Sequence, residues 1–264
     1  MTFQDTFLGR PGTIRTYKSL FKTHIEPLKI LQIEPAMIIW GEKGLSVRTR
    51  QILLRMLRNY IVHQGGPKIE VRRFHALLSR ETQQEELRVL TPEQSKLMMT
   101  TCRTVDPKFY PILLLGLHAG LRRGEVFGLR CGDVDLLKGK LRVARSYNGP
   151  TKNGKTRNVP LSKELQVAMT AARNLLMRHP EDRVFEILDP NPRLRNLCRQ
   201  LKLPMMRYHD LRHTFATMAL ESGISPRTVA SWLGHSSVTT TLSIYWNLTN
   251  KDETDLSFLP GGEI

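Results

Sequence analysis

The chain has 264 residues, of which 40% are hydrophobic, and it carries 40 Lys and Arg residues against 24 Asp and Glu residues. This length and apolar content suffice for one large or two modest domains with a packed core, which excludes a globally disordered chain. The formal net charge of +16 favours a polyanionic partner, with nucleic acid ahead of a membrane surface. A basic protein without such a partner is the alternative.

The cysteines and the apolar stretches exclude several other classes of protein. Cys102, Cys131 and Cys198 are odd in number and lack metal-ligand spacing, which argues against a disulfide framework and a zinc site and fits a reducing compartment. The first residues lack the charged-then-apolar layout of a secretion signal, and the most apolar stretch, PILLLGLHAGL, is too short to span a bilayer. We therefore expect a cytoplasmic protein that binds no metal and no membrane.

The first part of the chain is predicted to be helical. Apolar residues recur at helical spacing in TIRTYKSLFKTHIEPL and again in SVRTRQILLRMLRNYIVHQGG, where a Gly-Gly pair ends the pattern. Basic side chains lie on other faces of both segments and predict contacts with DNA phosphates, with ordinary solvated helix faces as the alternative. The predicted DNA-binding residues are Arg15, Lys18, Lys22, Arg48, Arg50, Arg55 and Arg58.

A polar, acidic stretch at 80–90 predicts a linker between a first domain, 1–85, and a second, 86–264. Thr91 then predicts the N-cap of a helix that has Pro92 in its first turn. Two short strands, 140–147 and 156–161, are predicted around a Gly- and Asn-rich turn, so the predicted class is mainly α with a small β-hairpin. The other segments of the second domain are predicted as helices over 93–104, 109–119, 122–130, 162–178, 190–202, 208–222, 226–234 and 237–246.

The first candidate site motif is HAGLRRGEVFGL. Its glycine before Leu121 permits a tight turn into a helix. Arg122, near the N-terminus of that helix, can present a guanidinium fork beside free backbone N–H groups to a phosphate. Glu125 can pair with Arg122 and hold its orientation, although plain pairing on a helix surface is the alternative.

The second motif, YHDLRHTFATMAL, places His209 and Arg212 on one face of a helix whose apolar residues turn elsewhere. A helix that packs on one face and aims an imidazole and a guanidinium from another is a suitable catalytic platform. For His213, which lies on the same helix, a structural role is the favoured interpretation. Two histidines without Glu or Cys partners at ligand spacing are a poor zinc motif.

Two lysines and a tyrosine complete the candidate groups. Lys152 and Lys155 lie in the predicted turn between the strands, where a lysine can donate a proton to a leaving oxygen, or contact only phosphate or water. His235 follows a helix-ending glycine, and Tyr245 follows later in SWLGHSSVTTTLSIY. A phenol with a pKa near 10 is a poor nucleophile unless cations or a base stabilise its phenolate. The arginines and histidines above would be such a set, and a half-buried structural tyrosine is the alternative.

Taken in chain order, these motifs resemble those of the tyrosine recombinase (phage integrase) family. The resemblance rests on AGLRRGE, TKNGKTRNVPL, HDLRHTFAT and LGHSSVTTTLSIY and extends over roughly residues 90–246. It implies a helical core-binding domain over 1–85, a catalytic domain with a C-terminal tail over 86–264, and no additional arm-binding domain before them. The implied activity is that of a site-specific recombinase, which cuts and rejoins DNA through a 3′-phosphotyrosyl intermediate during integration, excision or resolution.

The resemblance also implies a role for each site residue. Arg122 and Arg212 would clamp the scissile phosphate, and His235 would hydrogen-bond it. Lys152 would protonate the leaving 5′-oxygen, Glu125 would orient the first arginine, and Lys155 would contact DNA. His209 would act as acid and base for the nucleophile, Tyr245. The implied partners are double-stranded DNA, further copies of the chain in a tetrameric synapse, and accessory DNA-bending proteins; no cofactor is implied.

Two other functions are alternatives to this one. A catalytically inactive DNA-binding protein of the same fold would not need the complete set of catalytic residue types that this chain retains. A type IB topoisomerase shares the chemistry but usually has lysine or arginine at the position of His209. Both comparisons favour the recombinase.

Overall fold

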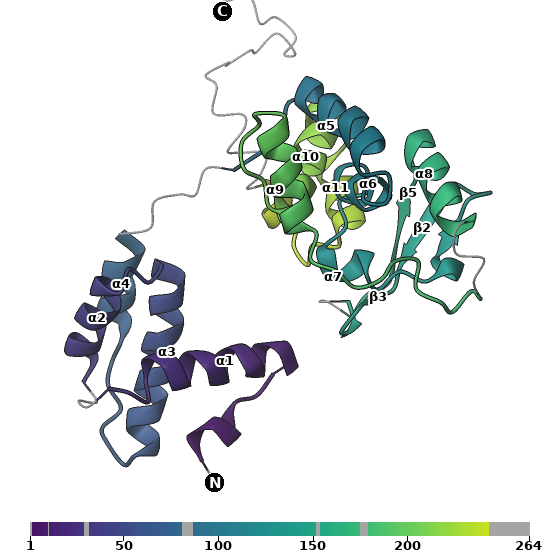
Figure 1. Cartoon of the computed structure of the whole chain (residues 1–264). Helices are drawn as coiled ribbons and strands as arrows, with labels where there is room; N and C mark the ends of the chain where they lie inside the picture. Colours follow the sequence, from purple (N-terminus) through teal and green to yellow (C-terminus); the bar gives the residue numbers. More distant parts are fainter. Residues whose placement is uncertain are drawn as a thin grey trace, which may run out of the picture. The chain divides into compact units, whose positions relative to one another are not determined.

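The computed structural model describes residues 2–9, 11–28, 32–80, 87–151, 154–174 and 179–242, except the side chains of residues 79, 80, 173 and 174. The chain divides into two compact units, Met1–Glu85 and Glu86–Ile264. Figure 1 labels helices and strands of both and colours the chain by residue number. None of the helices in these described ranges is long and apolar enough to cross a membrane.

The described part of the first unit is helical, as predicted. Its core contains the fully buried Ile25, Trp40 and Leu53, and the indole nitrogen of Trp40 donates to the carbonyl of His24 at 3.1 Å. The two predicted helices are present, and two shorter ones accompany them. The elements are η1 (Phe3–Thr6), α1 (Pro11–His24), α2 (Ile33–Glu42), α3 (Val47–His63) and α4 (Arg72–Arg80).

The second unit is built around one buried helix, α6 (Tyr110–Leu117), which packs against α5, α8 and α10. Every residue of α6 is buried, because its sequence is apolar throughout. Thr91 caps α5 as predicted: its hydroxyl accepts from the Gln94 N–H at 3.2 Å. The remaining helical elements are α5 (Pro92–Val105), α7 (Arg123–Val126), η2 (Cys131–Asp133), α8 (Lys163–Asn174), α9 (Asn191–Gln200), α10 (Tyr208–Glu221) and α11 (Pro226–Leu233).

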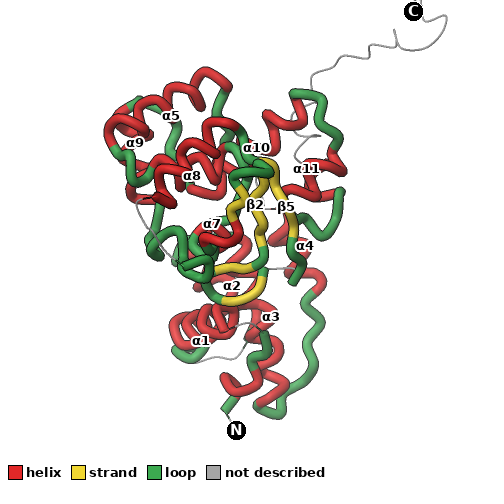
Figure 2. Tube along the Cα trace, turned by 90° about the vertical axis from the view of Figure 1, so that its right-hand side faces the viewer, coloured by secondary structure: helices red, strands yellow, loops and turns green. Residues whose placement is uncertain are grey.

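A small antiparallel sheet lies beside these helices and confirms the mainly α class with a minor β component. Strands β2 and β5 run side by side in the centre of Figure 2, with Val143 opposite Arg157 and Lys140 opposite Pro160. Helix α11 packs against β5. The strands are β1 (Val134–Asp135), β2 (Lys140–Val143) and β5 (Arg157–Pro160) in one sheet, and β3 (Arg145–Ser146) with β4 (Gly149–Pro150) in a two-stranded ribbon.

Two predicted elements were wrong in extent. The strand predicted over 140–147 breaks after Val143, because Arg145 and Ser146 turn back to pair with Gly149 and Pro150. The helix predicted over 122–130 is a single turn, α7, because the backbone beyond it bonds to a distant segment: the Val184 N–H donates to the Leu129 carbonyl at 3.0 Å. Of the helix predicted over 237–246, residues 239–242 are helical and 243–246 lie outside the described residues.

Gly120 is required at the turn that leads from α6 into α7. Its φ is +61°, and an added Cβ would lie 2.6 Å from side-chain carbons of both Leu233 and Phe215. Because the left-handed backbone and the overpacking both cost free energy, we expect Gly120→Ala to lower the free energy of unfolding by about 2–5 kcal/mol. Urea unfolding followed by circular dichroism measures this change.

Gly223→Ala is the matched control for that substitution. Its φ is +79°, but nothing lies within 4 Å of an added Cβ, so only the backbone term of about 1–2 kcal/mol applies. Equal losses for the two variants would contradict the steric part of the argument.

Candidate active site

The C-terminal end of α11 is the point on which three arginines of the second unit converge. Gly234 ends the helix in the left-handed conformation, with φ of +64°, and the His235 N–H donates back to the Ala230 carbonyl at 3.0 Å. The last carbonyls of a helix lack partners within it and carry partial negative charge. Guanidinium groups from three other elements supply those partners here.

Arg212, on α10, is 2% exposed and bridges two backbone segments. Its guanidinium donates to the carbonyls of Gly120 and Leu233, each at 2.6 Å. Burial, followed by the charge of Arg122, lowers the pKa of Arg212 from 12.5 to about 9, which leaves the group charged at neutral pH. The helix face predicted to carry Arg212 is therefore buried against the turn at Gly120.

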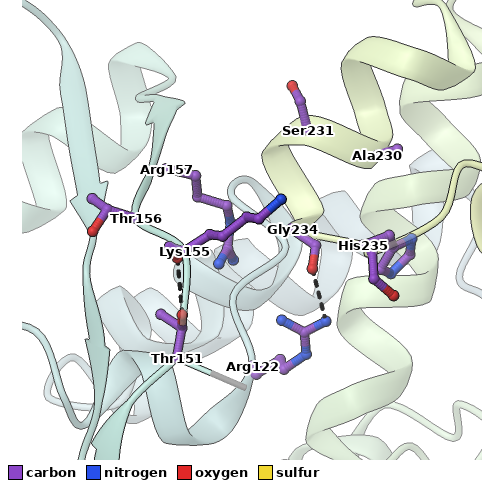
Figure 3. Close-up of a pocket in the computed structure, with 10 residues that line it drawn as sticks. Arg122, Thr151, Lys155, Thr156, Arg157, Ala230, Ser231, Gly234 and His235 are labelled. Carbon is purple, nitrogen blue, oxygen red and sulfur yellow. Dashed lines mark hydrogen bonds between the residues drawn. The ribbon is translucent and has the colours of Figure 1, made fainter. Parts of the chain in front are cut away.

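Arg122 reaches the same end of α11 from the N-cap position of α7, as the dashed line in Figure 3 shows for Gly234. Its guanidinium lies 3.4 Å from the carbonyl oxygens of Leu233 and Gly234 and 2.9 Å from the Glu125 carboxylate. The side chain is 25% exposed. These long contacts to neutral carbonyls leave donor capacity for an anionic ligand.

Glu125 pairs with Arg122, as the sequence predicted, and the pair is not a surface contact. The Glu125 side chain is 3% exposed and accepts both the backbone N–H and the guanidinium of Arg122 at 2.9 Å. Burial by itself raises the pKa of this carboxyl, but hydrogen bonds and charge from Arg157 and then from Arg122 outweigh it, so the pKa is lowered. The carboxylate is ionised at neutral pH.

Arg157 contacts the same carboxylate, and the sequence analysis did not single it out. It donates to the two Glu125 oxygens at 2.9 and 2.7 Å and to the Trp232 carbonyl at 2.5 Å. A signal was present in the sequence: alternation along a strand puts residue 157 on the same face as Val159, which is fully buried. A charged residue at an inward strand position implies a buried partner of opposite charge.

The two predicted histidines are held in neutral form. Nδ1 of His235 lies 2.8 Å from the hydroxyl of the buried Thr241. Burial, followed by the charges of Arg212 and Arg122, lowers the pKa of His235 to about 4. Burial, followed by His213, Arg212 and Arg122, lowers the pKa of His209 to about 4 as well. The rings of His209 and His213 meet edge to face, with their centroids 4.8 Å apart.

A cavity of about 270 Å³ opens beside these groups and is lined by Arg122, Arg157, His235 and Lys155 among others. Figure 3 shows Lys155 extending across it from the β5 side, while His235 and Arg122 border it from the helical side. The predicted catalytic residues Lys152 and Tyr245 lie outside the described residues. In the described ranges, no group of three His, Cys, Asp or Glu side chains is placed to hold a metal ion.

The basic residues predicted to contact DNA from the first unit lie on α1 and α3. Arg15, Lys18 and Lys22 are exposed on α1. On α3, Arg48 and Arg55 are exposed, whereas Arg50 and Arg58 are half-buried. The last of these donates to the neighbouring Asn59 side chain.

The lowered histidine pKa values predict how stability depends on pH. Between pH 4 and 6.5 the unfolded chain binds protons at His209 and His235 that the folded chain does not, since the folded values are about 4 and the ordinary value is 6.5. Their contribution to stability is therefore complete above pH 6.5 and is lost as the pH falls toward 4. We expect the melting temperature to fall over this window, and less steeply in a His209→Asn, His235→Asn double variant. Parallel curves for the two proteins would refute this origin of the pH dependence.

Comparison with known proteins places the chain in a family. A model described as the phage integrase family matches residues 88–252, which is more than half of the chain. The chain belongs to the phage integrase family. The matched residues include the three motifs that contain Arg122, Arg212 and His235.

Individual relatives of this phage integrase family member have low sequence identity to it but align over most of its length. The chain is 25% identical to a XerC-like tyrosine recombinase of Caldanaerobacter subterraneus subsp. tengcongensis, covering 95% of this chain and 76% of that protein. It is 29% identical to the tyrosine recombinase XerA of Thermococcus kodakarensis, covering 94% and 89%. Its fold is shared with the Tn1549 transposon integrase, solved in complex with transposon right end DNA, at a TM-score of 0.73 and 20% identity, covering 93% and 95%.

Proposed function

We propose that this protein is a tyrosine site-specific recombinase that cuts and rejoins double-stranded DNA. The observation that carries the proposal is the convergence of Arg122 and Arg212 on the Leu233 carbonyl, two residues before His235. Two guanidinium groups near a neutral imidazole suit a phosphodiester whose charge increases during reaction, and Arg122 and His235 also line the cavity. The family and its tyrosine recombinase members support the same reaction.

In the proposed reaction the phenol oxygen of Tyr245 attacks the scissile phosphorus, and the bond from phosphorus to the 5′-oxygen breaks. His209 accepts the phenol proton, which its neutral form permits, and Lys152 donates a proton to the departing 5′-oxygen. The products are a 3′-phosphotyrosyl link and a free 5′-hydroxyl. Attack by the 5′-hydroxyl of a partner duplex then reverses these bond changes and exchanges the strands.

The arginines and His235 stabilise the pentacoordinate transition state in this proposal. Arg122 and Arg212 donate to the non-bridging oxygens, for which a planar fork is better suited than an ammonium group. Nδ1 of His235 lies 2.8 Å from the Thr241 hydroxyl. In this proposal that hydroxyl donates to Nδ1, so the proton of the neutral ring resides on Nε2 and can be donated to the phosphate. Glu125 keeps Arg122 in place.

The partners follow from this chemistry. The basic helices α1 and α3 contact DNA phosphates in the first domain, and the second domain carries the reaction; strand exchange between two duplexes requires a tetramer of this chain. Accessory DNA-bending proteins assist, and the protein acts in the cytoplasm. Support comes from the net charge of +16 and from the Tn1549 transposon integrase, whose solved structure contains DNA.

Covalent trapping tests the proposal. The purified chain is incubated in EDTA with supercoiled DNA from the element that encodes it, quenched with detergent, and analysed for DNA linked to protein at a 3′ end. We expect metal-independent adducts at a discrete site. If the protein binds DNA from all flanks of the source element but never becomes covalently linked to it, the protein is a DNA-binding protein that does not catalyse the reaction.

A further inference from the structure

Arg157 is a largely buried arginine of the second unit. It is the first residue of β5, and its side chain is only 10% exposed. Its guanidinium uses three nitrogens at once: Nη1 and Nη2 donate to the two oxygens of Glu125, and Nε donates to the carbonyl of Trp232. A strand, α7 and α11 are thereby joined through one side chain.

The Glu125 carboxylate depends on Arg157 for half of its hydrogen bonds. Oε1 accepts from Nη1 of Arg122 and from Nη1 of Arg157, each at 2.9 Å. Oε2 accepts from the Arg122 N–H at 2.9 Å and from Nη2 of Arg157 at 2.7 Å. A buried carboxylate is strongly oriented when both oxygens are filled in this way. Arg157 therefore determines where Glu125 presents its oxygens to Arg122.

The same side chain orders the turn that precedes His235. Arg157 bonds to the carbonyl of Trp232, and Arg212 and Arg122 contact the two carbonyls that follow. Its guanidinium also lies against Gly234, where an added Cβ would be 2.9 Å from Nη1. Only a residue without a side chain allows this approach. The Arg157 side chain, on β5, thus helps to determine the direction in which the backbone leaves α11 toward His235.

Arg157 also lies close along the chain to Lys155. Lys155 is two residues before it and lines the same cavity. The inward face of β5 is held by Arg157 at its first residue and by the buried Val159 at its third. Lys155 therefore lies two residues from a side chain that is tied to the Arg122–Glu125 pair.

We propose that Arg157 is a positioning residue for DNA cleavage, acting through Glu125 on Arg122 and through the α11 end on His235. The inference rests on the proposed function. A lysine in its place retains the charge but offers one ammonium group, which cannot reach both Glu125 oxygens and the Trp232 carbonyl with fork geometry. Arg122 and His235 are then no longer held in the orientation that the reaction needs. DNA binding is retained, because the positive charge at position 157 is unchanged.

The first test separates cleavage from binding. Single-turnover cleavage of a nicked duplex carrying the mapped site, and affinity for the same duplex by gel shift, are measured for the wild type and Arg157→Lys. We expect cleavage to slow by about 10–100-fold, as for small displacements of a reacting geometry, with affinity unchanged within about twofold. The control is Arg183→Lys: Arg183 donates to the Phe127 carbonyl at 2.8 Å, just beyond α7, but does not contact Glu125. Equal effects of the two variants would overturn the proposal.

A modified phosphate distinguishes positioning from general loss of structure. A methylphosphonate at the scissile position replaces one charged oxygen by a methyl group, so the transition state depends less on the arginines. We expect the deficit of Arg157→Lys to shrink by about tenfold on this substrate, in parallel with that of Arg122→Lys. A deficit of the same size on both substrates would show that Arg157 does not act through the arginine.

A measurement without DNA keeps this inference separate from the proposed function. In the nitrogen NMR spectrum of the full chain, a restrained Arg122 guanidinium gives a slowly exchanging Nε–H signal, which Arg122→Lys identifies by its loss. We expect faster exchange of that signal in Arg157→Lys and no change in Arg183→Lys. A wild-type chain that never cleaves DNA would contradict the proposed function but not the positioning role of Arg157. An Arg122 signal that is unchanged in Arg157→Lys would contradict that positioning role.

Discussion

Replacing Tyr245 by phenylalanine is expected to abolish the covalent protein–DNA adduct and to leave DNA affinity within about twofold of the wild type, since one phenol oxygen contributes little to a phosphate-dominated interface. The proposed reaction needs that oxygen as the nucleophile, and no other group on the ring can replace it. Trapping on the mapped site measures the adduct, and a gel shift on the same duplex measures affinity. Adducts of undiminished yield in Tyr245→Phe would assign the nucleophile elsewhere.

The other tyrosines of the chain sharpen this expectation. Burial raises the pKa of both Tyr110 and Tyr208, whose hydroxyl groups are bonded to Glu164 and to the Ile112 carbonyl, so neither is available as a phenolate. In the first unit, Tyr17 and Tyr60 pack among aromatic rings. These two pairs are therefore poor candidates for attack on a phosphodiester.

Tyr147 is the matched control for Tyr245. It is half-buried in the second unit, and its hydroxyl lies 3.4 Å from the Arg123 guanidinium. We expect Tyr147→Phe to form adducts at the wild-type rate. A loss of adducts in this variant, rather than in Tyr245→Phe, would move the nucleophile to the β3–β4 ribbon.

Arg212→Lys is expected to slow cleavage by about 10²–10³-fold, the usual loss when one donor to a developing oxyanion is removed. Arg212 is 2% exposed and holds the Gly120 and Leu233 carbonyls with its two terminal nitrogens. A single ammonium group cannot satisfy both carbonyls and a phosphate oxygen. Single-turnover cleavage measures the effect on the reaction.

Stability should fall in the same variant. Leaving one buried carbonyl without a donor costs about 1–3 kcal/mol, which urea unfolding detects. Arg207→Lys is the control, because Arg207 pairs with Asp210 at the start of the same helix but its side chain is 61% exposed. The Asp210 carboxylate of this pair is 1% exposed, but lysine keeps a positive charge beside it, so Arg207→Lys should lower stability less than Arg212→Lys and leave cleavage unchanged. Cleavage by Arg212→Lys at the wild-type rate would remove Arg212 from the proposed phosphate clamp.

Local sequence determined most of the helical elements. The cap formed by Thr91 and Gln94, the apolar stripes of α1 and α3, and the uniformly apolar α6 each depend on residues within a few positions of one another. Helical hydrogen bonds and caps close over three or four residues, so their signals can be read directly along the chain. The pairing of Arg122 with Glu125 was predictable for the same reason.

The extent of the strands and of α7 depended on distant segments. Residues 140–147 alternate like one strand, yet the β3–β4 ribbon interrupts them. The segment after α7 bonds to residues 182–184, some fifty positions away. Pairing over such distances is specified by the packed core and not by neighbouring residues, which is why local pattern did not reveal it.

The site shows the same division. The sequence by itself determined which residue types recur in the family motifs, and hence the family and the reaction proposed for it. Only the tertiary structure decided that Arg122, Arg157 and Arg212 meet at the carbonyls of Trp232, Leu233 and Gly234. Those contacts bring together four elements from across the second unit. Every residue has a backbone carbonyl, so the sequence does not indicate which carbonyls accept these hydrogen bonds. These contacts matter because the groups are removed from water. Buried charges and the carbonyls at a helix end cost free energy unless the fold supplies hydrogen-bond partners.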